Sequence, residues 1–436
     1  MPAARTAGIF IVPAVLDCVA TKQMIRILES KDMGQVLARR AAQMTDAEAV
    51  VRPILEAVRT RGDAGLMEYA RRFDKLERGS VSVARSEMSA AAERLTPQFR
   101  NAVEVASNNV RRFAELQLPR ESMVELGPGH RVGQLVRPLD TVAAYVPAGR
   151  YPLPSTVIMT VVPALVAGVP NVCVACPKPV DEVWGTAHIL GAHHVFQMGG
   201  AQAVAAFAYG TETVPRADRI VGPGNIYVAA AKKLLAGEVG IDFVAGPTEI
   251  LIIAADADPR FLAADMLAQA EHDTDASAIL LTTSRSLAEA VALEIERQLQ
   301  TLTTADVARE SIDRNGAILV VDSLDEAVEL SNEFAPEHLS IHHGELLPRI
   351  RHAGGVFVGA FSPEAAGDYA SGPNHVLPTS GVARLRGGLS AADYVKVISV
   401  QQLDRAALAG LAPSVTTLAR AEGLEAHARS VEVRLV

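Results

Sequence analysis

The pattern of apolar and polar positions changes from helical to mixed strand-and-helix near residue 141. Residues 45–115 carry apolar positions at spacings of three and four behind a polar Thr45 or Asp46, which predicts helices. From residue 141 onwards, short β-rich runs alternate with helical segments. Strands are predicted at 141–147, 171–177, 195–200 and 219–224, and helices at 154–169 and 201–210. This alternation is typical of a parallel sheet with helices on both faces.

A second series of the same kind begins at residue 249. Strands are predicted at 249–257, 278–284, 316–323, 339–341 and 355–360, and helices at 259–271, 286–300 and 324–334. A loop-rich stretch at 361–390 and a helical tail at 404–430 complete the chain. The sequence therefore predicts an α/β protein with two parallel-rich units, a helical N-terminal segment and a small C-terminal helical tail.

Length and composition restrict the class of protein. A chain of 436 residues is long enough for two large domains with appendages. Its 41 basic and 50 acidic residues give a formal net charge of −9, and without a basic run this argues against nonspecific nucleic-acid binding. Three cysteines do not make a disulfide framework and indicate a reducing cytoplasm.

Two apolar stretches resemble targeting or membrane segments without matching them. Residues 7–16 are similar to a weak signal-peptide core, but Asp17 interrupts them. Met24 begins a plausible native start, so we interpret residues 1–23 as an upstream extension, with an export signal as the alternative. The stretch 156–177 is broken by two prolines and a glycine, and it therefore predicts two short elements and no membrane span.

Candidate chemistry begins at the C-terminal end of the helix predicted at 259–271. Gln269 and His272 are three residues apart on one helix face, so a carbonyl oxygen and an imidazole could meet at one cation. Asp265 lies on nearly the same face and could orient the imidazole. The alternative interpretation is a hydrated helix end.

Further candidates lie in the second half of the chain. Glu337 and His338 are an adjacent acid and base directly before a predicted strand, where they could divide proton transfers between them. The polar, Gly-rich stretch 367–375 is of the kind that carries function on a long ordered loop. Together, Gln269, His272, Asp368 and His427 would supply two nitrogens and two oxygens, a set that suits zinc with open positions.

Cysteine and glycine signals are weaker. Cys173 and Cys176 form a CxxC, but a period-2 strand places them on opposite faces, which favours ordinary small core residues over a metal or redox pair. The turns at 222–225 and 199–200 could let backbone approach a phosphate at a helix N-terminus. Neither is a G-x-G-x-x-G motif, so spacing alone does not establish a dinucleotide site.

Eight segments, in this order, resemble the histidinol dehydrogenase family and cover nearly the whole chain after Met24. They are YVPAGRYPLPSTVIM (145–159), MGGAQAVAA (198–206), VGPGNIYVAAAK (221–232), GIDFVAGPTEILIIA (240–254), LAQAEHD (267–273), APEHLS (335–340), GDYASGPNHVLPTSG (367–381) and EGLEAH (422–427).

The resemblance implies a zinc-dependent enzyme that oxidises L-histidinol to L-histidine with two NAD, in the last steps of histidine biosynthesis. By matching position it implies zinc ligands, an acid–base pair, substrate contacts and NAD contacts. The implied zinc ligands are Gln269, His272, Asp368 and His427, and the implied acid–base pair is Glu337 and His338. The implied substrate contacts are Thr248, His375 and Glu422, together with the zinc ligands and His338. The implied NAD contacts are Tyr145, Gln202 and Asn225.

The resemblance also implies an arrangement of domains. Family members are homodimers with two incomplete Rossmann-like domains, and the C-terminal segment reaches into the partner's site. We therefore expect residues 24–140 and 248–392 to form the domain of the metal and acid–base residues. Residues 141–247 would form the NAD-side domain, and 393–436 a tail swapped onto the second subunit.

Some positions depart from the family pattern. Thr248 stands where the family commonly has Ser, Ser340 where we expect an acidic residue, and 384–389 is not the commonest sequence after the preceding loop. Relatives that oxidise another small alcohol, such as a sulfonated propanediol, alter the blocks around GDY and AEHD, which are intact here. A zinc hydrolase is a remote alternative, because it has no need of the α/β unit at 141–247.

Overall fold

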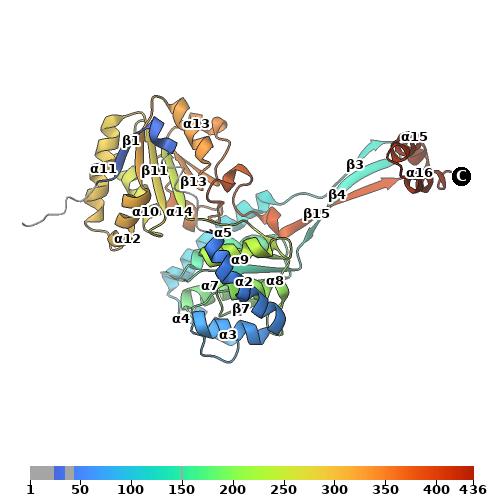
Figure 1. Cartoon of the computed structure of the whole chain (residues 1–436), viewed down its shortest axis with the longest axis horizontal. Helices are drawn as coiled ribbons and strands as arrows, with labels where there is room; N and C mark the ends of the chain where they lie inside the picture. The colour runs from blue at the N-terminus through green and yellow to red at the C-terminus, as the bar shows by residue number, and fades with distance from the viewer. Residues whose placement is uncertain (1–23, 35–43, 149–150) are drawn as a thin grey trace, which may run out of the picture.

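Two parallel-rich sheets and a projecting arm make up the chain in the computed structural model, which describes residues 24–34, 44–148 and 151–436 (Figure 1). The predicted α/β class with parallel-rich sheets is confirmed. The extension expected at residues 1–23 lies outside the described residues. Among the described residues, no helix is long and apolar enough to cross a membrane.

The first sheet is parallel throughout and has the strand order β1-β12-β11-β10-β13-β14. Its strands are β1 (Arg26–Glu29), β10 (Glu249–Ile253), β11 (Ser277–Thr282), β12 (Ala317–Val320), β13 (His338–Ile341) and β14 (Gly355–Val358). Its helices are α10 (Pro259–Ala270), α11 (Arg285–Leu299), α12 (Ala305–Asn315), α13 (Leu324–Phe334) and the short α14 (Glu364–Tyr369).

The second sheet has the order β2-β7-β6-β5-β8-β9 and is parallel except for the edge strand β2. Its strands are β2 (Ser82–Val83), β5 (Thr141–Tyr145), β6 (Asn171–Ala175), β7 (His194–Phe196), β8 (Arg219–Val221) and β9 (Gly240–Ile241). Its helices are α2 (Met44–Arg61), α3 (Asp63–Phe73), α4 (Arg85–Arg94), α5 (Pro97–Gln117), α6 (Pro154–Val166), α7 (Asp181–Leu190), α8 (Gly200–Tyr209) and α9 (Ile226–Leu235).

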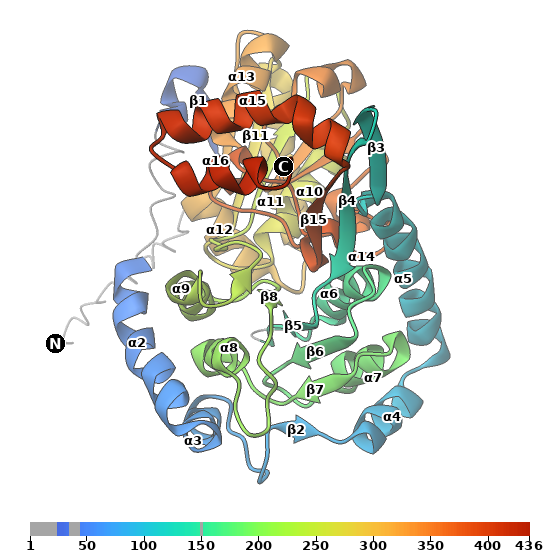
Figure 2. The same cartoon turned by 90° about the vertical axis from the view of Figure 1, so that its right-hand side faces the viewer.

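Strict alternation along the buried strands builds the cores on both faces of each sheet. In β10, Ile250 and Ile252 pack on the face covered by α10, α11 and α12, whereas Leu251 packs on the face covered by α13. In the second sheet, Cys173 lies on the face of α2, α3, α8 and α9, and Cys176 on the face of α4 to α7 (Figure 2). The prediction that the two cysteines are core residues on opposite faces is confirmed.

The arm is built from segments far apart in sequence. It is a three-stranded antiparallel sheet of β3 (Ser122–Gly127), β4 (His130–Pro138) and β15 (Val395–Leu403), followed by α15 (Arg405–Ala421) and α16 (Glu425–Glu432). Figure 1 shows that the arm projects away from both sheets and carries the C-terminus at its tip. The sequence predicted the helices of this tail but none of its strands.

The structure differs from the expected domain grouping at residues 44–117. Only β1, of the segment 24–117, joins the first sheet, while α2, α3, α4 and α5 pack against the second. The physical reason is that an amphipathic helix specifies which of its faces is buried but not which sheet covers that face. The second domain is therefore larger than the range 141–247.

Candidate active site

The acid–base pair lies at the amino ends of two neighbouring strands. β10 and β13 pair in parallel with Ile250 opposite His338, so the residues that precede β10 lie beside Glu337. Helix α13 ends at Phe334, and the next residue, Ala335, has a left-handed conformation with φ of 51° that directs the chain into β13. Glu337 and His338 are consequently both buried at the amino ends of the strands of the first sheet.

Glu337 is held by the start of β10. Its Oε2 accepts hydrogen bonds from Thr248 Oγ1 at 2.6 Å and from the Glu249 backbone N–H at 2.9 Å. Burial raises the pKa of the Glu337 carboxyl, against the lowering effect of His338 and these two donors. A buried carboxyl with a raised pKa in a fixed orientation is suited to proton transfer.

His338 is surrounded by acidic groups. Its Nδ1 lies 3.6 Å from Glu337 Oε2 and 3.7 Å from Glu364 Oε1, and its Nε2 lies 3.6 Å from Asp368 Oδ1. Burial alone would lower the pKa of His338, but the carboxylates of Glu364, Glu337 and Asp368 together raise it well above its usual value. Nε2 is buried, and among the described residues it has no hydrogen-bond partner.

Three predicted ligands converge beside this imidazole. Gln269, at the end of α10, is fully buried and lies 2.8 Å from Thr248 Oγ1 through its side-chain amide. His272 Nδ1 lies 2.9 Å from the Ala268 carbonyl oxygen, which leaves Nε2 to face Asp368 Oδ2 at 3.9 Å. The structure thus brings Gln269, His272 and Asp368 together. No hydrogen bond or ion pair of the described residues joins Asp265 to His272, and burial raises the pKa of Asp265 to about 6.

Glu364 is a site residue that sequence reasoning missed. It lies four residues before Asp368 on α14, so both face the same way, and its carboxylate, His338 and Asp368 offer ligand atoms within 4.8 Å of one another. With its amide turned so that NH2 faces this carboxylate, Gln269 donates to Glu364 Oε1 at 2.8 Å. The i, i+4 acidic pair was the available signal.

His375 links this site to the second domain. Its Nδ1 lies 2.8 Å from the Asp368 carbonyl oxygen, and its Nε2 lies 3.3 Å from Thr156 Oγ1 on α6. A cavity of about 350 Å³ opens beside Asp368 and His375, with Phe357 and Asn374 in its walls. This volume is enough for a small-molecule substrate.

The two remaining C-terminal candidates lie elsewhere. Glu422 follows α15 and His427 lies on α16, both exposed on the arm. Figure 1 shows this helix pair far from the first sheet of the same chain. One subunit alone therefore does not bring Glu422 or His427 to the cluster around His338.

The predicted NAD contacts gather at the carboxyl end of the second sheet. The chain leaves β5 towards β6 and leaves β8 towards β9, so neighbouring strands β5 and β8 diverge at their carboxyl ends, where α/β sheets bind ligands. The Tyr145 hydroxyl accepts from the Gly200 N–H at 3.1 Å, and Gln202 Nε2 donates to Asp74 Oδ2 at 2.9 Å. Asn225 caps α9 by accepting from two backbone N–H groups.

Comparison with known proteins identifies the family of the chain. The histidinol dehydrogenase family model matches residues 37–435. The histidinol dehydrogenase of Geobacter sulfurreducens is 48% identical over 415 residues, which cover 93% of this chain and 97% of that protein. The chain belongs to the histidinol dehydrogenase family.

Other members of the histidinol dehydrogenase family agree. The enzyme of Thermus thermophilus is 50% identical over 392 residues, covering 89% of this chain and 94% of that protein. The crystal structure of histidinol dehydrogenase from Elizabethkingia anophelis superposes with a TM-score of 0.90 at 34% identity, covering 94% of this chain and 98% of that one. The family resemblance of the sequence blocks and the prediction of a dehydrogenase are confirmed.

Proposed function

We propose that this enzyme oxidises L-histidinol through bound L-histidinal to L-histidine, with zinc and two NAD. The observation that carries the proposal is the cluster at the amino ends of β10 and β13. There the buried pair Glu337–His338 lies against Gln269, His272 and Asp368. Family membership supports the place of the reaction in histidine biosynthesis.

The donor chemistry of this cluster fits zinc. His272 and Asp368 offer an imidazole nitrogen and a carboxylate oxygen, and Gln269 offers its amide oxygen in the orientation in which its Nε2 donates to Thr248 Oγ1. The buried His338 Nε2, which has no hydrogen-bond partner among the described residues, lies 3.6 Å from Asp368 Oδ1. We propose that Gln269, His272 and Asp368 hold the ion together with His427 of a second copy. When bound, zinc would anchor the amino and imidazole nitrogens of the substrate and so orient its alcohol.

His338 serves as base for the alcohol step in this proposal. With its proton on Nδ1, it donates to the Glu249 carbonyl oxygen at 3.2 Å, and Nε2 is then free to accept the hydroxyl proton of the substrate. The carboxylates of Glu337, Glu364 and Asp368 stabilise the imidazolium that forms. When bound, NAD would accept hydride from the substrate carbon that carries this hydroxyl.

Glu337 serves as base for the aldehyde step. Its Oε2 is fixed by Thr248 and the Glu249 N–H, and burial raises its pKa towards the range in which a carboxylate accepts a proton from water. Water so activated hydrates bound L-histidinal, and a second hydride transfer gives the carboxylate. Thr248, His375 and Glu422 are the proposed further substrate contacts.

We place NAD at the divergence of β5 and β8, against Tyr145, Gln202 and Asn225. Support comes from the strand order and from the family resemblance of these positions. Gly222, at the end of β8, has a φ of +107°, and a Cβ there would lie 2.2 Å from the Tyr145 carbonyl oxygen. Backbone therefore approaches closely where the dinucleotide is proposed to lie.

We propose a homodimer with shared sites. The position of the arm supports it, because Glu422 and His427 are exposed on the arm, which projects away from the cluster of their own chain. A C₂ pair would place each arm at the other subunit's site.

Steady-state reduction of NAD by L-histidinol tests the proposal, with a sulfonated propanediol and small amino alcohols as alternative substrates. The proposed function requires L-histidinol to give the highest kcat/KM, with two NADH formed per L-histidine. Preference for another alcohol, or one NADH per turnover, would refute it.

A further inference from the structure

The loop 374–394 binds the second domain at both of its ends. Near its start, Asn374 Nδ2 donates to the Met159 carbonyl oxygen at 2.6 Å. At its end, the Tyr394 hydroxyl donates to the Thr160 carbonyl oxygen at 2.9 Å. Both acceptors lie on α6, so this loop, which begins beside the proposed substrate site, is fixed to the domain proposed to bind NAD.

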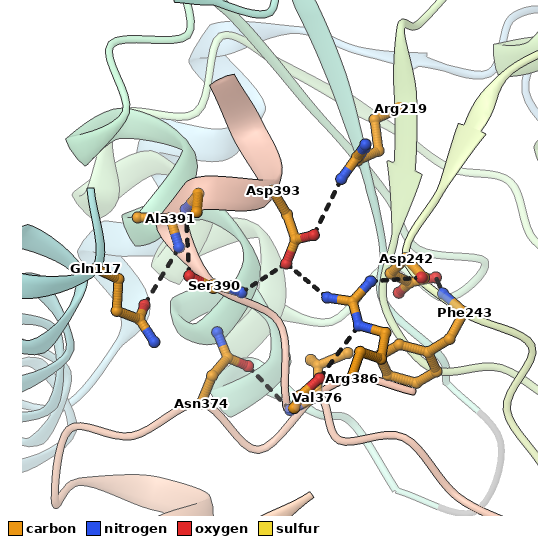
Figure 3. Close-up of polar contacts among 12 residues, drawn as sticks. Gln117, Arg219, Asp242, Phe243, Asn374, Val376, Arg386, Ser390, Ala391 and Asp393 are labelled. Atoms are coloured by element: carbon orange, nitrogen blue, oxygen red, sulfur yellow. Dashed lines mark hydrogen bonds and ion pairs between the residues drawn. The ribbon is translucent and has the colours of Figure 1, made fainter. Parts of the chain in front are cut away.

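Arg386 lies at the centre of this loop, between two acidic residues (Figure 3). Its Nη1 donates to the Asp242 backbone oxygen at 2.7 Å, and its Nη2 donates to Asp393 Oδ2 at 2.6 Å. The guanidinium carbon lies 5.4 Å from the Phe243 ring centroid. Arg219, on β8, donates to Asp393 Oδ1 at 3.1 Å, so one carboxylate joins the loop to the second sheet.

Asp242 extends the contact to the turn after β8. Its Oδ2 accepts from the Gly222 N–H at 2.7 Å, and its carboxylate forms a buried ion pair with Lys232. Lys232 Nζ in turn donates to the Gly222 carbonyl oxygen at 2.8 Å. The residue whose carbonyl binds Arg386 therefore also binds the Gly222 N–H through its side chain, and it pairs with the lysine that binds the Gly222 carbonyl oxygen.

We propose that Arg386 is a positioning residue for hydride transfer. Through Asp393 and Asp242 it fixes the loop that follows His375 against the turn at Gly222, and so sets the separation between the substrate and NAD sides of the active site. The inference rests on the proposed function.

Both hydride transfers require the same approach of substrate carbon and nicotinamide, and small misplacements at that distance are costly. Loss of Arg386 is therefore expected to slow oxidation of L-histidinol and of L-histidinal alike. Equal slowing of the two oxidations distinguishes a positioning effect from loss of the base His338, which should slow mainly the oxidation of L-histidinol. A planar guanidinium reaches two acceptors at once, whereas an ammonium does so poorly.

The kinetic test compares Arg386→Ser and Arg386→Lys with the matched control Arg216→Ser. Arg216 also binds a backbone oxygen and a carboxylate, both of Glu238, but at the opposite end of β8. Arg386→Ser should lower kcat on both substrates by roughly 10-fold or more, with the KM for L-histidinol within about twofold. Arg386→Lys, which keeps the charge and the stem, should fall between this variant and wild type, and Arg216→Ser should match wild type.

Wild-type kcat in Arg386→Ser, an equal loss in Arg216→Ser, or a loss on only one substrate would overturn the proposal. Where Arg386→Ser does not fold, Arg386→Lys decides, and wild-type turnover in it overturns the role.

Amide hydrogen exchange tests the coupling without substrate or NAD. Arg386→Ser should speed exchange both in 375–393 and in the turn at Gly222, whereas Arg216→Ser should change neither. Faster exchange in 375–393 alone would refute the link to Gly222. If wild type fails to reduce NAD with L-histidinol, the proposed function fails, and the exchange result still reports whether Arg386 couples the two segments.

Discussion

The two sheets have similar topology but carry their candidate chemistry at opposite ends of their strands. In the first sheet, the acid–base cluster lies at the amino ends of β10 and β13. In the second, the proposed NAD contacts lie at the carboxyl ends of β5 and β8, the usual ligand-binding end of such a sheet. The fold alone predicts the second location but not the first.

The polar groups of the two regions also differ. Around His338, carboxylates lie close together without direct hydrogen bonds between them, and its Nε2 has no partner among the described residues. Around Tyr145 and Gln202, by contrast, the Tyr145 hydroxyl accepts from the Gly200 N–H and Gln202 Nε2 donates to Asp74. A buried imidazole nitrogen among carboxylates is suited to proton transfer, whereas side chains already held by hydrogen bonds are suited to a preformed binding surface.

Removal of metal should have the largest effect on activity, and it should act only on the site of the first sheet. Chelation is expected to abolish NAD reduction while the fold persists, because both sheets have large apolar cores that do not depend on an ion. Activity and far-ultraviolet circular dichroism of the same sample check this, with zinc re-addition as control. Unfolding upon chelation would contradict it.

His338→Asn should have the next largest effect. Because His338 is proposed to accept the proton of the alcohol, turnover of L-histidinol should fall by about 10²–10⁴-fold, and turnover of L-histidinal far less. The matched control is His342→Asn, directly after the opposite end of β13, which should keep wild-type rates. Equal losses on both substrates would defeat the assignment to the alcohol step.

Local pattern predicted the buried strands well and the arm poorly. Strands such as β10 and β6 have side chains buried on both faces, so their apolar runs are plain in the sequence. In β3 and β15 most residues are exposed or half-buried, and no alternation marks them as strands. β15 pairs with β4 across more than 250 positions, which no local window contains, whereas β3 and β4 are neighbours in sequence.

Motif resemblance predicted more of the site than spacing did. Gln269 and His272 share a helix end, but only the fold shows that Asp368 reaches them from α14. Glu364 was missed because its stretch was predicted as loop, although it lies one helical turn before Asp368. His427 lies on α16 of the arm, far from this cluster in the same chain, so its proposed role requires a second copy.

Complementation between two inactive variants tests whether the site of the first sheet is completed by a residue of the second subunit. His427→Ala and His338→Ala should each be inactive alone. Co-expressed, about half of the dimers should be mixed, each with one intact site of two, so roughly a quarter of wild-type activity should return. Activity of affinity-purified mixtures measures this. Mixed dimers that form and stay inactive would show that His427 works within its own subunit.

The smallest effect is expected from the paired groups of the second sheet. Asp74 Oδ2 accepts from the Gly199 N–H and from Gln202 Nε2, both at 2.9 Å, and so orients the Gln202 amide at the proposed NAD site. Asp74→Asn keeps the size of the side chain but replaces one acceptor with a donor. A hydrogen bond to a charged group contributes about 1.5–3 kcal/mol, and only part of this loss should reach the cofactor, so the KM for NAD should rise by roughly tenfold or less while kcat changes little.

Asp63→Asn is the matched control for this last variant. Asp63 starts the same helix, α3, and likewise accepts two hydrogen bonds, but from the backbone and hydroxyl of Thr213, away from β5. It should therefore leave the KM for NAD unchanged even if it lowers the melting temperature. Titration of NAD binding to both variants decides the matter. An equal change in the two would mean that Asp74 acts only through stability, and that the second sheet's paired groups do not shape the NAD site.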